Sequence, residues 1–148
     1  MQKTKIEAGT WVVACDGRKW VIMENAGDSK FPNLRVKETD QQENPPTSQQ
    51  GSDAPPRSFA SVGHARSAIE QTDWHDEMER KFLGALAQHL DAAVGAGKVK
   101  EMIVVAPPRA LGMIRKTYSE RLKNAVRLEI DRDVVKMPVH EIEKLLSA

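Results

Sequence analysis

One short apolar run limits the possible folds of this chain more than any other feature. Met102-Ile-Val-Val-Ala106 is continuously apolar, a pattern typical of a central strand that is covered on both faces. Apolar residues recur at helical spacing before this run and again after it, at Met78, Phe82, Leu86, Leu90, Ala93 and Val94 and then at Leu111, Ile114 and Leu122. Because a helix between parallel strands forms a right-handed crossover, this order predicts an α/β domain.

The other strands are predicted on both sides of this unit. Thr10–Cys15 and Lys19–Glu24 form a hairpin around Asp16-Gly17, and Leu34–Glu38 alternates like a strand with one solvated face near a sheet edge. A fifth strand is predicted from the alternating apolar residues Val126, Leu128 and Ile130. The prediction is a mixed five-stranded sheet with helices packed on it, in a single α/β domain over residues 1–148.

Two further helical regions follow the central strand. Pro107-Pro108 stops that strand, and residues 110–126 are predicted to be helical in two pieces that break near Tyr118-Ser119. Pro138 opens a final helix whose apolar face carries Val139, Ile142, Leu145 and Leu146.

The segment from residue 40 to residue 71 differs from the rest of the chain. From Asp40 to about Ser61 it consists mainly of Gln, Asn, Pro, Ser and Gly, which cannot bury enough apolar surface to offset the entropy of ordering. Small and charged residues continue to Gln71. We therefore predict a long mobile loop over residues 40–71, with a helix capped by Thr72 or Asp73 and ended by Gly95 and Gly97.

Composition excludes several classes of function. Cys15 is the single cysteine, so no internal disulfide forms, and no metal-ligand spacing surrounds it. The nucleotide-binding loops and hydrolase elbows are missing from the sequence, so no cofactor is expected. Lysine and arginine total 22 against 21 acidic residues, so a nucleic-acid partner would need a local basic patch. With no signal-peptide or membrane-spanning pattern, we expect a cytoplasmic protein without a membrane partner.

The predicted loop contains one candidate binding site. Arg57, His64 and Arg66 bring positive or protonatable groups into it, and Gly63 would let a backbone approach a phosphate or sugar closely. These residues suit a tip that contacts RNA. They equally suit an ordinary polar loop.

Two other groups of residues are candidates for chemistry. Arg109 follows the central strand and precedes a helix, where it would find an anion, or it is a solvated surface residue. The carboxylates near predicted strand ends could converge on two magnesium ions, as a metal-dependent nuclease requires: Asp16, Glu24, Asp131 and Asp133. Strand-end acids are also commonplace on protein surfaces, and Asp16 is accounted for by the hairpin turn.

Three segments together resemble a known family. They are "WVVACDGRKWVIMEN", "FASVGHARSAIEQTDWHDEMERKF" and "MIVVAPPRALGMIRKTYSERLKNAV", and they resemble the bacterial host-attachment proteins, named as required for attachment to host cells. That family in turn is similar to the middle domain of archaeal and eukaryotic peptide-chain release factors. The resemblance implies a ribonuclease-H-like topology with a mobile loop ahead of a long helix.

The resemblance also defines what this chain lacks. The release-factor loop carries Gly-Gly-Gln, which places a water for hydrolysis of peptidyl-tRNA, whereas Ser61–Ala68 here keeps only Gly63 and has no such glutamine. A backbone path built for two glycines is sterically unfavourable beside Val62 and His64. We therefore predict a non-enzymatic module that contacts the ribosome, tRNA or a protein partner. The alternatives are a metal-dependent nuclease and an indirect factor in host attachment; the sequence leaves the oligomeric state open.

Overall fold

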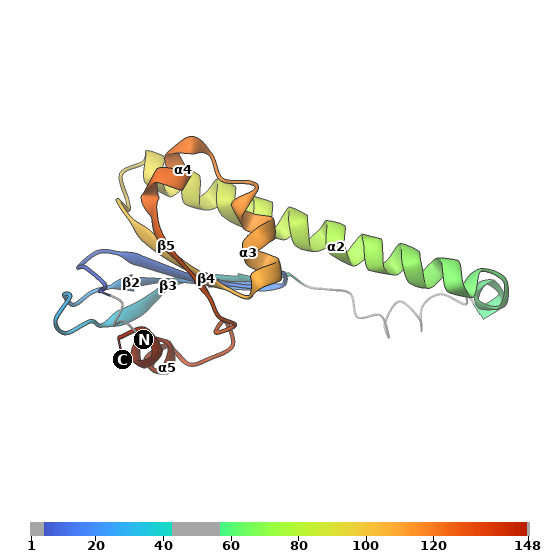
Figure 1. The fold of residues 1–148 in the computed structure, drawn as a ribbon, viewed down its shortest axis with the longest axis horizontal. Helices are drawn as coiled ribbons and strands as arrows, with labels where there is room; N and C mark the ends of the chain where they lie inside the picture. The colour runs from blue at the N-terminus through green and yellow to red at the C-terminus, as the bar shows by residue number, and fades with distance from the viewer. Residues whose placement is uncertain (1–4, 43–56, 148) are drawn as a thin grey trace.

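The structure is a computed structural model that describes residues 5–42 and 57–147, with the backbone alone described over residues 57–74. Its centre is a five-stranded sheet in the order β3-β2-β1-β4-β5 (Figure 1). The strands are β1 (Trp11–Cys15), β2 (Lys19–Asn25), β3 (Leu34–Gln41), β4 (Met102–Ala106) and β5 (Val126–Asp131). Pairing is antiparallel for β1 with β2 and for β2 with β3, and parallel for β1 with β4 and for β4 with β5. The predicted mixed α/β sheet is confirmed.

Helices cover both faces of this sheet. One face packs against α2 (Arg57–Gly95), α3 (Pro108–Arg115) and α4 (Glu120–Ala125), and the other against α5 (Val139–Ser147) (Figure 1). The break between α3 and α4 lies where Tyr118-Ser119 predicts it, because the Ser119 side chain caps α4 by accepting a hydrogen bond from the backbone N–H of Leu122 at 3.0 Å. Pro138 directly precedes α5, as predicted.

The molecule has two hydrophobic cores, one on each face of the sheet, because the two central strands are buried on both faces. Every residue of β1 and of β4 is buried, which confirms the interpretation of Met102–Ala106 as a covered strand. Side chains alternate between the two faces: Val104 packs toward α2, whereas Ile103 and Val105 pack toward α5. Trp11 and Trp20 belong to the core on the α2 face.

The strand predicted from Leu34 is the edge strand β3, but the single solvated face that its alternation predicts is wrong, because Val36 is 48% exposed. Only Leu34 is buried in it, and the seven residues after Leu34 are exposed. Its pairing with β2 shifts register between Ile22 and Met23, an irregularity typical of strands at a sheet edge.

The predicted loop over residues 40–71 is wrong at both of its ends. Strand β3 continues to Gln41, and helix α2 already begins at Arg57 instead of Thr72 or Asp73. The part of the prediction that covers residues 43–56 lies outside the described residues. Within the described chain no helix is both long and apolar enough to cross a bilayer, because α2 has the length but carries many charged residues.

Candidate functional site

Helix α2 has two parts with different surroundings. In its C-terminal part the residues buried against the sheet face are Leu83, Leu86, Ala87, Leu90 and Ala93. Its N-terminal part continues past the sheet and projects from the body of the molecule (Figure 1). At about 1.5 Å of rise per residue, the 39 residues of α2 amount to about 58 Å of helix measured along its axis. We call residues 57–74 the arm.

The arm carries all four residues that the sequence nominated for the loop. Arg57, Gly63, His64 and Arg66 lie on one continuous helix instead of an irregular segment. Helical N–H groups bond to carbonyls four residues earlier, so Gly63 does not offer the open backbone that a loop would provide. A ligand on the arm would therefore meet side chains.

A signal for the start of this helix was present in the sequence. Pro55-Pro56 directly precedes Arg57, and proline is favoured at the beginning of helices. No proline follows until Pro107, so nothing in the sequence after Arg57 forces the helix to stop before Gly95. The polar composition and Gly63 suggested a loop, but composition of this kind is also compatible with a solvated helix.

The arm leaves the body next to Arg109. The Arg109 guanidinium forms ion pairs with Asp76 and with Glu79, where Arg109 Nη2 lies 3.3 Å from Glu79 Oε1. The Glu79 side chain also lies against the β1–β2 turn at Gly17, where an added Cβ would come within 2.6 Å of the Glu79 Cγ. Glu79 is thus held between the turn and Arg109, and these contacts fix the base of the arm.

This geometry gives Arg109 a role that the sequence did not predict. It does lie just past the carboxyl end of β4, where the sequence predicts an anion-binding position. The anions it contacts are carboxylates of this chain, supplied by α2, and its side chain remains 59% exposed. Arg109 therefore acts as the link between α3 and the base of the arm.

The four carboxylates that could bind magnesium do not share a common partner. Asp16 Oδ1 accepts 2.8 Å hydrogen bonds from the backbone N–H groups of Arg18 and Lys19, and Glu24 pairs with Lys37 at 3.3 Å. Asp131 and Asp133 are exposed. Over residues 5–42 and 75–147, no three His, Cys, Asp or Glu side chains come together in a way that could hold a metal ion.

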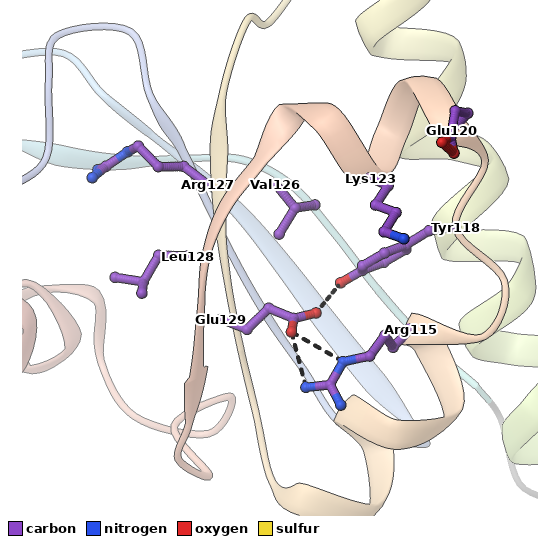
Figure 2. A pocket seen from close by; sticks show the side chains of 8 residues that line it. All are labelled: Arg115, Tyr118, Glu120, Lys123, Val126, Arg127, Leu128 and Glu129. Carbon is purple, nitrogen blue, oxygen red and sulfur yellow. Dashed lines mark hydrogen bonds and ion pairs between the residues drawn. The ribbon is translucent and has the colours of Figure 1, made fainter.

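A cavity of about 640 Å³ lies between the α3–α4 region and β5 (Figure 2). In its lining, Glu129 accepts hydrogen bonds from the Tyr118 hydroxyl at 3.0 Å and from Arg115 Nε at 3.0 Å. Burial, followed by the Glu129 charge, raises the pKa of Tyr118 above its usual range, so this hydroxyl stays protonated and donates. Glu129 on β5 is bonded to both Arg115 and Tyr118. These bonds hold the connection between α3 and α4 on β5.

Cys15 is not a nucleophile in this structure. Its side chain is buried at the end of β1, and burial raises the pKa of the thiol to about 12, with the Asp16 charge adding to the effect. The thiolate that alkylation or metal binding requires is therefore scarce at neutral pH.

Comparison with known proteins places this architecture in a family. The pattern of bacterial archaeo-eukaryotic release factor family 12 matches residues 9–146. The chain belongs to this family. A segment of 79 residues, 52% of this chain, is 30% identical to Uncharacterized protein RP470 of Rickettsia prowazekii (strain Madrid E). That segment covers 53% of the Rickettsia protein, so the match spans about half of each chain.

The family match agrees with part of the resemblance seen in the sequence. Residues 9–146 include the β1–β2 hairpin, the whole of α2 and the segment that joins β4 to α3. The family is described by its relation to archaeal and eukaryotic release factors, which confirms the release-factor-like domain. The host-attachment name is not part of that description and stays a prediction.

Proposed function

We propose that this member of family 12 is a non-enzymatic binding module of the translation apparatus, whose arm contacts RNA of the ribosome or of tRNA in the cytoplasm. The observation that carries the proposal is the projection of α2 beyond the sheet, with Arg57, His64 and Arg66 on the projecting part (Figure 1). Positive side chains on an exposed element bind phosphates through electrostatics and the release of counterions. A chain with a formal charge of only +1 needs a local group of cations to bind RNA, and the first ten residues of the arm, from Arg57 to Arg66, contain two arginines and no acid.

Two observations favour binding over hydrolysis of peptidyl-tRNA. The sequence contains no Gly-Gly-Gln, and Gly63, the glycine of the comparable segment, lies within a helix. A helical backbone keeps its N–H groups in its own hydrogen bonds, so it cannot present them to a reacting ester. The proposed module therefore recognises an RNA partner without cleaving its ester bond.

The strand order β3-β2-β1-β4-β5 supports the ribonuclease-H-like topology that the resemblance implies. It does not by itself support the nuclease alternative, because the described carboxylates do not converge. Cleavage of RNA that needs magnesium and disappears in Asp131→Asn would favour the nuclease over our proposal. An indirect role in host attachment remains compatible with an RNA-binding module.

The proposal is tested by measuring the affinity of the full chain for purified ribosomes and for tRNA over a range of salt concentrations. Arg57→Ala combined with Arg66→Ala removes two arm charges and should weaken binding. If both contact phosphates, the slope of log affinity against log salt should fall by roughly 1.4 to 1.8. Arg80→Ala combined with Lys81→Ala is the matched control, because both residues are exposed cations of α2 close to the body.

The outcomes separate clearly. Loss of binding in the arm variant with retention in the control supports the arm as the contact. Equal binding by both variants, or binding that does not change with salt, would overturn the proposal. Circular dichroism should show that both variants retain the helix content of the parent protein.

A further inference from the structure

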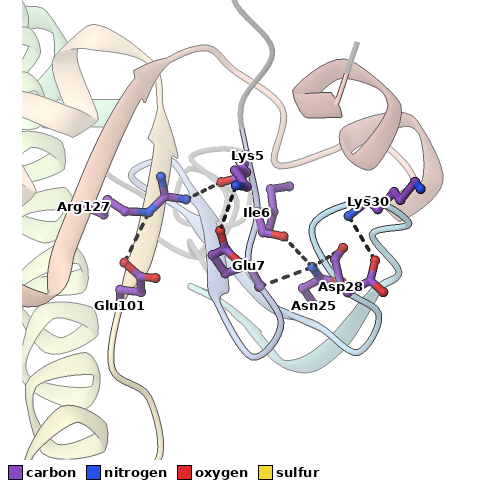
Figure 3. A network of polar contacts seen from close by, with 8 residues as sticks. All are labelled: Lys5, Ile6, Glu7, Asn25, Asp28, Lys30, Glu101 and Arg127. Carbon is purple, nitrogen blue, oxygen red and sulfur yellow. Dashed lines mark hydrogen bonds and ion pairs between the residues drawn. The ribbon is translucent and has the colours of Figure 1, made fainter.

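The connection between β2 and β3 is held by a single buried amide. Asn25 is 2% exposed, and its Nδ2 donates to the backbone carbonyl oxygens of Ile6 at 2.8 Å, Glu7 at 3.3 Å and Asp28 at 3.2 Å (Figure 3). The amide therefore ties the chain before β1 to the residues that follow β2. We call residues 26–33 the Asn25 loop.

The other end of the same amide closes the loop. Asn25 Oδ1 accepts hydrogen bonds from the backbone N–H groups of Gly27 at 2.9 Å and Asn33 at 2.8 Å. A Cβ on Gly27 would lie 2.2 Å from the carbonyl oxygen of Phe31, so only glycine allows this close approach. The loop is therefore tightly closed by hydrogen bonds and by steric fit.

Phe31 is presented to solvent by this closed loop. Its side chain is 71% exposed, the largest exposure of any large apolar residue over the described chain. Its backbone N–H donates to Asp28 Oδ1 at 2.7 Å, and its carbonyl oxygen accepts from the Asp28 N–H at 3.2 Å. Both polar groups of the Phe31 backbone are thus bonded within the loop.

Single exposed apolar residues are common on proteins and by themselves imply nothing. Phe31 differs because its backbone is fixed, so little further ordering would be needed when a partner packs on the ring. The Lys30 ammonium lies 5.9 Å from the centroid of the ring, and Arg35 is exposed at the start of the neighbouring strand. An aromatic face accompanied by cations suits an unpaired nucleotide, whose base stacks and whose phosphate is negatively charged.

We propose that the Asn25 loop is a second RNA contact, in which an unpaired base stacks on Phe31 and Lys30 and Arg35 face the phosphate backbone. This inference rests on the proposed function for the class of ligand, but it concerns a different part of the molecule. The Asp28 carboxylate is the acid of this loop, and its Oδ1 is directed to the loop backbone, where it accepts hydrogen bonds from the N–H groups of Lys30 and Phe31.

The topology places this contact far from the arm. The β1–β2 turn lies at the base of the arm, where Gly17 meets Glu79, and β2 runs back antiparallel to β1. The Asn25 loop therefore lies at the opposite end of the sheet, as Figure 1 shows. A small ligand could not touch both sites, whereas a single large RNA could, and engagement of both sites by one RNA would raise the overall affinity.

The test measures binding of the full chain to a short fluorescent single-stranded oligoribonucleotide and to a duplex RNA of equal length. Phe31→Ala should weaken binding to the single strand about tenfold, and Phe31→Trp should retain it because indole also stacks on bases. Binding to the duplex, whose bases are already stacked, should change much less. Leu128→Ala is the matched control, since Leu128 is an exposed apolar residue on the other edge of the sheet.

The binding measurements distinguish the second RNA contact from the proposed function. Weaker single-strand binding by Phe31→Ala, with rescue by Phe31→Trp, supports the second contact. Unchanged binding by Phe31→Ala overturns it, and if the Arg57→Ala and Arg66→Ala variant still loses ribosome binding, the proposed function stands alone. If the parent protein binds neither ribosomes nor either RNA, both proposals fail. Equal thermal midpoints for parent and Phe31→Ala verify that the exposed ring does not support the fold.

Discussion

The arm and the Asn25 loop lie at opposite ends of the molecule and are held in different ways. The arm is one continuous helix that is fixed where it leaves the body, through the ion pairs of Arg109 and the contact of Glu79 with Gly17. The loop is fixed along its own length by hydrogen bonds around Asn25. The direction of a long helix can therefore be fixed by contacts at one end, whereas the position of a single exposed side chain depends on a rigid backbone at that residue.

The largest effect is expected from damage to the body that supports both regions. Leu86 is 1% exposed and lies in the core between α2 and the sheet. Leu86→Ala should lower the free energy of unfolding by about 2–5 kcal/mol, because it removes buried methyl groups and leaves a cavity. Urea denaturation measures this loss.

Ala65→Pro is the contrasting substitution, because it breaks the helix within the arm and leaves the core intact. It should reduce the helix signal in circular dichroism but leave the main urea transition almost unchanged. If it shifted that transition as much as Leu86→Ala does, the arm would be part of the cooperative core and the distinction between arm and body would fail.

A smaller effect is expected at the loop. Asn25→Ala removes the partner of the buried Ile6 carbonyl and of the part-buried N–H groups of Gly27 and Asn33, and a buried group left unsatisfied costs about 1–3 kcal/mol. We expect a lower unfolding free energy and faster hydrogen exchange at the amides of Gly27 and Asn33. Exchange rates in the arm should not change, because the arm and the loop share no described contact.

A second substitution at Asn25 tests whether the amide donor is needed. Asn25→Asp keeps the oxygen that accepts hydrogen bonds from Gly27 and Asn33 but replaces the donor to Ile6 and Glu7 with a second acceptor. Its effect on stability should be at least as large as that of Asn25→Ala, because a buried charge then faces carbonyl oxygens. A harmless Asn25→Asp would show that the amide donor is not needed.

A still smaller effect on stability is expected at the base of the arm. Arg109 is more than half exposed, and ion pairs of this kind contribute no more than about 1 kcal/mol. Arg109→Ala should hardly change the urea midpoint, yet it should broaden the range of arm orientations. Spin labels at Ser61→Cys and Lys98→Cys would report this as a wider distance distribution. Cys15 will not compete for label, since it is buried and its pKa is raised to about 12.

Arg115→Ala is the control for that experiment, because it also removes an exposed arginine of α3 with a carboxylate partner, but the partner is Glu129 on β5. The distance distribution should then match that of the parent protein. An unchanged distribution in Arg109→Ala would show that packing of α2 alone directs the arm.

These contrasts also explain which features the sequence could predict. Met102–Ala106 and Trp11 reveal their burial through local patterns of apolar residues, so the strands and the core are predictable. The pairing of Arg109 with Asp76 is not, because 33 residues separate them and no local pattern encodes the contact. Asn25 has the composition of an ordinary turn residue, and its burial follows from the chain segments that converge on it.

The arm was missed for a different reason. A solvated helix has no need of an apolar stripe, so the periodic signal that reveals α2 against the sheet is missing from the segment that begins at Arg57. Its polar composition and Gly63 then suggested a loop. The proline pair before Arg57 was the one local indication of a helix start, and prolines also occur in loops.

The smallest predicted effect concerns the anchoring of α4 on the C-terminal part of α2, away from both exposed regions. Asp91 accepts hydrogen bonds from Arg121 Nε at 2.9 Å and Nη2 at 2.8 Å and from the Ser119 hydroxyl at 2.5 Å. These bonds, those from Arg121 first, lower the pKa of Asp91 to about 2. Because the folded pKa lies below the ordinary aspartate value of 3.8, the stabilisation is complete well above pH 3.8 and is lost as the pH falls toward 2.

Asp91→Asn tests this linkage. The thermal midpoint of the variant should lie slightly below that of the parent protein near neutral pH, and the difference should shrink as the pH falls through the window set by the two pKa values. The difference in thermal midpoint should be small because Asp91 is at the surface, where solvent screens its charge. A difference that stays constant down to about pH 2 would mean that the hydrogen-bond geometry at Asp91, and not its charge, holds α4 on α2.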